Sequence, residues 1–194
     1  LNATLSLSLG LSAFVLSKPD FSQADLAQVA ASLMRLQPAI RSVAMAPDNV
    51  IRFVYPQAGN QKALGLRYLD TPAQRDAVLR LMREQRPVTA GPIELAQGGV
   101  GIINRIPVTF TRPDGLPHYW GLVSVVINPL PVFEHAGIRA DARSGVRYAL
   151  RGKDGLGPLG EVFLGDAALF GDAEAVLMDV VIPGGRWQLA ARAA

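Results

Sequence analysis

The chain has 194 residues, a length that suits one domain or two compact halves. Hydrophobic residues make up 49% of it and charged residues 18%, which excludes an intrinsically disordered protein. The cations behind the formal net charge of +3 are spread along the chain, so nucleic acid is not an expected partner, and the absence of cysteine excludes thiol chemistry and cysteine-based metal sites.

The chain starts with an apolar segment, residues 5–16, that is too short to cross about 30 Å of hydrocarbon. It also lacks the positive flank and cleavage site of a signal peptide. Its apolar positions recur at three- and four-residue steps, which predicts a helix. Because the chain begins without methionine, we expect it to be a fragment of a longer protein.

A second helix is expected after Ser22, which has the features of an N-cap, with Asp25 three residues later in a variant of the capping box. Pro38 ends this helix. The pattern then alternates on both sides of the turn at 47–49, which predicts a β-hairpin.

The rest of the chain predicts one more long helix and two groups of strands. Thr71 and Pro72 are typical of a helix start. Turn signals at 97–99 and 113–115 separate the next three expected strands, 88–95, 101–110 and 119–128, and a short helical or irregular linker follows to residue 138. Four short strands are then expected at 147–151, 160–164, 177–182 and 187–192. The fold class is therefore α+β, with N-terminal helices and two antiparallel sheets.

No pattern in the sequence indicates catalysis. There is no Gly-x-Ser-x-Gly nucleophile motif, and the spacing of the acidic residues selects no carboxylate pair. The glycine-rich stretch 97–101 lacks the lysine of a phosphate-binding loop and is interpreted as a strand connection. We predict no catalytic residue, no metal site and no cofactor.

Two arginines stand in apolar surroundings and are the first candidates for a binding site. Arg67 lies in the run 63–69, and Arg105 lies in the strand expected at 101–110. A guanidinium at such a position needs a partner, and its geometry suits a carboxylate or a phosphate. An internal ion pair, or a side chain that reaches the protein edge, is the alternative for both arginines.

Several segments follow the order and spacing of a known family. They include the run 43–56, the helix start at 71–78, the strand at 87–95, Pro107 with Val108, and the segment 119–124. The helix at 21–33 and the closing Gly184-Gly185-Arg186-Trp187 are similar to the flanks of the same family. On these segments the chain resembles the CHASE domains, a family of extracytoplasmic sensory domains.

The resemblance implies a fold and a cellular setting. It implies two PAS-like subdomains behind an N-terminal helical region, with boundaries at 1–38, 39–130 (membrane-distal) and 131–194 (membrane-proximal). It further implies a periplasmic sensor anchored by transmembrane helices and coupled to a diguanylate cyclase, a phosphodiesterase or a histidine kinase. We also expect a homodimer formed through the N-terminal helix.

The resemblance also indicates where a ligand would bind. In the plant cytokinin receptors of the family, a key aspartate stands where this chain has Arg67. Because an arginine only donates hydrogen bonds and has the opposite charge, we expect a small anionic ligand such as a carboxylate. Arg67 is its predicted anchor, Thr89 a second contact, and Tyr55, Tyr68 and Arg105 are predicted wall residues. A dimerisation or interaction module without a small-molecule ligand is the alternative.

Overall fold

The computed structural model describes residues 2–138 and 145–193. Its helices are α1 (Asn2–Ser17), α2 (Gln23–Leu36), α3 (Pro72–Glu84) and α4 (Pro129–His135). The strands of the first sheet are β1 (Ile40–Pro47), β2 (Phe53–Tyr55), β3 (Val88–Glu94), β4 (Val100–Thr111) and β5 (Pro117–Ile127). The strands of the second sheet are β6 (Val146–Arg151), β7 (Val162–Gly165), β8 (Val176–Ile182) and β9 (Gly185–Ala193).

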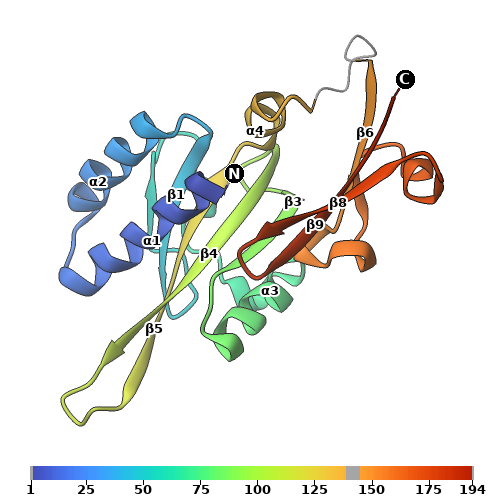
Figure 1. The fold of residues 1–194 in the computed structure, drawn as a ribbon. Helices are drawn as coiled ribbons and strands as arrows, with labels where there is room; N and C mark the ends of the chain where they lie inside the picture. Colours follow the sequence, from blue (N-terminus) through green and yellow to red (C-terminus); the bar gives the residue numbers. More distant parts are fainter. Residues whose placement is uncertain (1, 139–144, 194) are drawn as a thin grey trace.

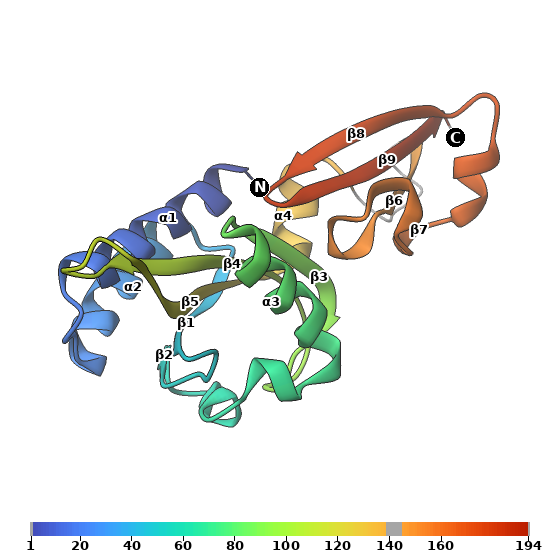
Figure 2. The same cartoon turned by 90° about the horizontal axis from the view of Figure 1, so that it is seen from below.

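The N-terminal helices α1 and α2 form as expected and cover one face of the first sheet (Figures 1 and 2). The capping box at the start of α2 is complete, because the Ser22 side chain accepts from the Asp25 N–H and the Asp25 carboxylate accepts from the Ser22 N–H. In α1, Leu11 and Val15 are fully buried, whereas Leu9 and Leu16 are exposed.

The first sheet is antiparallel throughout, with the strand order β2-β1-β5-β4-β3. Because side chains alternate across a sheet, neighbouring residues of β4 face different helices. Asn104 bonds to Ser8 of α1 on one face, and Arg105 bonds to Gln74 of α3 on the other. The α3 face holds its own apolar cluster, with Val78 and Leu81 of α3 packed among sheet residues.

The second sheet is also antiparallel, with the order β7-β6-β9-β8, and lies beside the first sheet (Figure 2). Its buried Trp187 packs edge-on against Phe133 of α4 and Phe163 of β7. The predicted α+β class, with N-terminal helices and two PAS-like antiparallel units, is therefore confirmed. We call the unit around the first sheet the first subdomain and the unit around the second sheet the second subdomain.

The two subdomains meet along β3, the edge strand of the first sheet. The Thr89 N–H donates to the Pro183 carbonyl oxygen over 2.9 Å, and the Gly91 N–H donates to Asp154 Oδ1 over 2.7 Å. The contact is close, since a Cβ on Gly184 would lie 2.8 Å from the Pro87 carbonyl oxygen. The second subdomain thus supplies acceptors to an edge that would otherwise expose unpaired N–H groups.

Candidate functional site

A cavity of about 30 Å³ lies in the first subdomain on the α3 face of the sheet. Such a volume holds about two water molecules. Most of its wall is apolar, with Ile51, Val54 and Ile103 among the lining residues. The polar side chains in the wall come from five different elements or connections of the chain: Ser42, Tyr68, Gln74, Gln97 and Ser124.

Arg105 lies directly behind two of these lining residues and is 0% exposed. Its Nη2 donates to the Gln74 amide oxygen, and its Cζ stands 5.0 Å from the centre of the Tyr68 ring. Its Nε and Nη1 are buried and have no hydrogen-bond partner. Among the described residues, no carboxylate forms an ion pair with it.

Burial lowers the pKa of the Arg105 guanidinium, and the neighbouring Tyr68 and Asp154 partly oppose this shift. An arginine nevertheless keeps its proton in proteins. The site therefore contains a buried positive charge with two unused donors, which is the electrostatic complement of an anion.

Tyr68 and Ser124 complete the polar group around Arg105. The Tyr68 hydroxyl and the Ser124 hydroxyl are 2.8 Å apart, and both residues are buried. Ser124 of β5 stands opposite Arg105 of β4 in the strand register. Two hydroxyls, an amide and a guanidinium thus converge where a small polar group could be held.

The sequence did not single out Gln74 or Ser124 as site residues. Gln74 stands four residues before the buried Val78 on the inward face of α3, so helical periodicity places it inside. Ser124 alternates with Leu122 and Val126 in β5, and all three are buried. A polar residue at a position where the pattern requires an apolar one is the signal that identifies both.

The other predicted site residues lie outside this group. The Arg67 side chain is 66% exposed, and its Nε donates to Asp70 Oδ2 over 2.7 Å. Its neighbours Leu66 and Tyr68 line the cavity, so Arg67 stands at the outside of the same wall. Of the five candidates, the structure brings only Tyr68 and Arg105 together.

Thr89 and Tyr55 belong to the opposite face of the first sheet. Thr89 is fully buried beside Asn104, with 3.4 Å between Thr89 Oγ1 and Asn104 Oδ1, and Asn104 donates to Ser8 Oγ over 2.7 Å. Tyr55 packs against the apolar cluster beneath α1 and α2. The sheet therefore separates these two residues from Arg105.

Within residues 2–138 and 145–193, no three histidine or acidic side chains gather as they would around a metal ion. None of the helices in the same ranges is both long and apolar enough to cross a membrane.

This architecture also occurs in known proteins. The fold is similar to that of a solved structure, the extracellular ligand binding receptor from Desulfohalobium retbaense DSM5692, with a TM-score of 0.69 and 18% sequence identity. The match covers 98% of this chain and 37% of the receptor chain, so this chain spans little more than a third of that protein. No curated protein matches the chain.

The chain thus has tandem α+β subdomains, and the first contains a small cavity with polar side chains in its wall. The family model of the CHASE domain matches residues 17–156, which is most of the chain. The chain therefore belongs to the CHASE domain family, and the predicted family is confirmed.

Proposed function

We propose that this domain is the periplasmic sensor of a transmembrane signalling protein and that it binds a small carboxylate in the first subdomain, with Arg105 as the anchor. The observation that carries the proposal is the fully buried guanidinium with two unpartnered nitrogens. A buried charge without a counterion costs several kcal/mol, and a bound anion offsets that cost. Membership of a sensory family supports the same function.

Gln74 stands between the cavity and Arg105, since it lines the cavity and accepts from Nη2. A carboxylate that replaces the Gln74 oxygen would face Nη2 together with either Nε or Nη1, which is the bidentate geometry of strong arginine–carboxylate pairs. The Tyr68 and Ser124 hydroxyls would bond the polar part of the ligand. Because the cavity is small, the proposed ligand is compact or opens the pocket when it binds.

Arg67 enters the proposal as a contact at the rim of the pocket, since its side chain is exposed beside the wall. Arg105 takes over the anchoring role that the sequence predicted for Arg67. We propose no direct ligand contact for Thr89 or Tyr55, because both lie across the sheet.

The wider setting is proposed from family membership. The sensor would connect to a diguanylate cyclase or phosphodiesterase of cyclic di-GMP signalling, or to a histidine kinase of a two-component system. The proposed division of the chain is 1–38, 39–130 and 131–194. A homodimer through α1 is supported by the exposed Leu9 and Leu16, and light scattering on wild type and Leu16→Asp tests it, with a monomeric wild type counting against it.

Isothermal titration with a panel of small mono- and dicarboxylates tests the ligand class. We expect at least one carboxylate to bind the wild type and Arg105→Met to weaken it at least a hundredfold, because the buried donors are removed. Arg86→Met is the matched surface control, because Arg86 is exposed and does not line the cavity, and it should leave the affinity unchanged. Equal affinities of wild type and Arg105→Met would refute the role of Arg105.

A module without a small-molecule ligand is the second candidate function, and the small volume of the cavity favours it. This second function predicts that the domain forms a dimer and that none of the carboxylates binds to it.

A further inference from the structure

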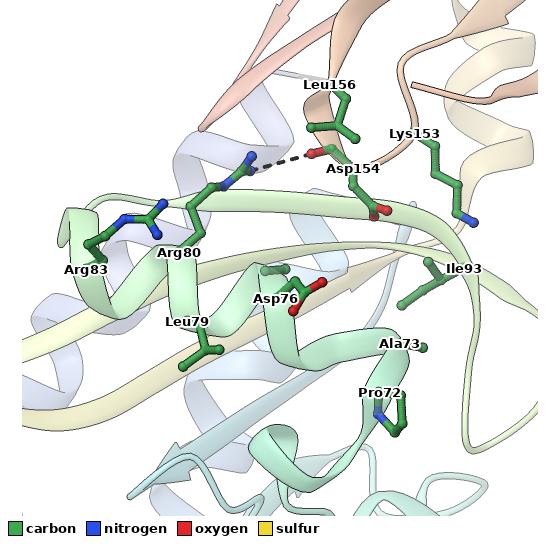
Figure 3. Close-up of a pocket in the computed structure, with 11 residues that line it drawn as sticks. Pro72, Ala73, Asp76, Leu79, Arg80, Arg83, Ile93, Lys153, Asp154 and Leu156 are labelled. Carbon is green, nitrogen blue, oxygen red and sulfur yellow. Dashed lines mark hydrogen bonds between the residues drawn. The ribbon is translucent and has the colours of Figure 1, made fainter. Parts of the chain in front are cut away.

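A second and much larger cavity lies between the two subdomains. It has a volume of about 630 Å³, within the range of about 300–1,000 Å³ that is usual for small-molecule sites. Helix α3 forms one wall, and the segment 153–156 of the second subdomain forms the other (Figure 3). We call this cavity the interdomain cleft.

The interdomain cleft has charges of both signs, and most of its cations are already paired. Lys153 Nζ lies 3.1 Å from Glu161 Oε2, and Arg83 Nη2 lies 3.3 Å from Glu84 Oε1. Arg80 differs from them, because none of the ion pairs in the described part of the chain includes it. Its contact with the second subdomain is a long hydrogen bond of 3.5 Å from Nη2 to the Asp154 carbonyl oxygen, and its Nε is buried without a partner.

Two carboxylates face the same space. Asp76 stands four residues before Arg80 in α3, a spacing at which opposite charges often pair, yet no ion pair joins them. Asp154 accepts one hydrogen bond from the Gly91 N–H. In Figure 3 the guanidinium groups of Arg80 and Arg83 lie on the left, and the Asp76 and Asp154 carboxylates lie to their right.

The arginines and carboxylates of the interdomain cleft together determine which charges a ligand must have. A simple anion at Arg80 would also face the two carboxylates, and a simple cation at the carboxylates would face the two arginines, so each meets repulsion. A zwitterion avoids both repulsions, because its negative group can face the arginines while its positive group faces the carboxylates. Leu79, Ile93 and Leu156 provide an apolar surface for a short carbon chain between the charged ends.

We propose that the interdomain cleft is a second ligand site, for a zwitterionic molecule of amino-acid size. The anionic group binds Arg80 and Arg83, and the cationic group binds Asp76 and Asp154. Because its walls belong to both subdomains, an occupied cleft ties α3 to the segment 153–156. The residues that line the interdomain cleft are different from those that line the cavity beside Arg105.

Isothermal titration of the whole domain with ω-amino acids from glycine to 6-aminohexanoate tests the proposal, with butyrate and butylamine as singly charged controls. We expect at least one ω-amino acid to bind at least tenfold more tightly than either control. Arg80→Met and Asp76→Asn should each weaken that binding at least tenfold. Arg86→Met is the matched control, because Arg86 is exposed just after the same helix and does not line the cleft.

The Arg105→Met variant separates the two sites. Binding of the ω-amino acid that persists in Arg105→Met and is lost in Arg80→Met assigns the ligand to the interdomain cleft. Three results would overturn the proposal: no ω-amino acid binds at millimolar concentration, Arg80→Met and Asp76→Asn bind as wild type, or Arg105→Met alone abolishes binding. Thermal unfolding of each variant verifies that it is folded, and since Asp76 is exposed, Asp76→Asn provides a test free of core disruption.

Discussion

Replacing Arg105 by methionine should make the ligand-free domain more stable, although it removes the proposed ligand anchor. Methionine has a similar length and fills the same apolar space without a charge. The substitution removes a fully buried guanidinium whose Nε and Nη1 have no partner. It also removes the bond to Gln74 and the contact with the Tyr68 ring.

The magnitude follows from these contacts. Each unpartnered buried donor costs about 1–3 kcal/mol, and a buried charge without a counterion adds several more. Against this, the lost Gln74 bond is worth about 1.5–3 kcal/mol and the lost cation–π contact about 2 kcal/mol. Gln74 lines the cavity, so water can replace its lost partner. The net expectation is a gain of about 2 kcal/mol, or a Tm higher by roughly 4–8 °C for a domain of this size.

Urea and thermal unfolding of the ligand-free protein measure the effect. Arg105→Lys serves as the control, because it keeps a buried charge and should not be stabilised. A loss of more than about 1 kcal/mol in Arg105→Met would refute the reasoning, since Arg105 would then be a structural residue whose local bonds outweigh its desolvation.

Three further predictions concern the helices and the contact between the subdomains. Ser22→Ala removes the N-cap of α2 and should lower the free energy of unfolding by about 1 kcal/mol, measured in urea. The pKa of the Asp25 carboxyl is lowered by hydrogen bonds from the Lys18 side chain and from the Ser22 N–H and side chain. The contribution of Asp25 to stability is therefore complete above the usual carboxyl pKa near 4 and is lost as the pH falls through the lower folded-state pKa. The stability difference between wild type and Asp25→Asn should therefore be larger at pH 7 than at pH 2; a constant difference would contradict this. Gly184→Ala places a Cβ 2.8 Å from the Pro87 carbonyl oxygen at a φ of +77°. It should destabilise the domain by about 1–3 kcal/mol and speed amide exchange at Thr89. Gly115→Ala is the control, because a Cβ on Gly115 would meet no neighbouring atom, and it should leave the exchange at Thr89 unchanged.

Periodicity and turn chemistry predicted most elements of the fold because those signals are local. The capping residues of α2, the proline at the start of α3 and the turns between strands each act within a few residues. The strand order β2-β1-β5-β4-β3 could not be predicted in this way, since it depends on pairings between distant segments.

The sequence could predict the position of a site residue only where that residue lies within a long helix or strand. Arg105 lies in a long, mostly apolar strand in which residues 101–106 are all buried, so its apolar surroundings correctly placed it inside. Arg67 lies between two short 3-10 turns, Gln61–Ala63 and Tyr68–Asp70, where alternation does not apply, and its side chain points outward to Asp70. Thr89 follows Val88, the residue that pairs with Arg105 across the sheet. Because successive side chains of a strand point to opposite faces, Thr89 lies on the face opposite Arg105.

The two N–H groups of β3 that point away from β4 have consequences for receptor engineering. The acceptors for Thr89 and Gly91 are Pro183 and Asp154, both in the second subdomain. A chimera that transplants only the first subdomain onto a foreign partner would leave both donors without these acceptors, at a cost of about 1–3 kcal/mol for each one that stays buried. The unit to exchange between receptors when a biosensor is built is therefore the pair of subdomains, and a graft that must be shorter needs the segments 152–157 and 183–185 carried along with it.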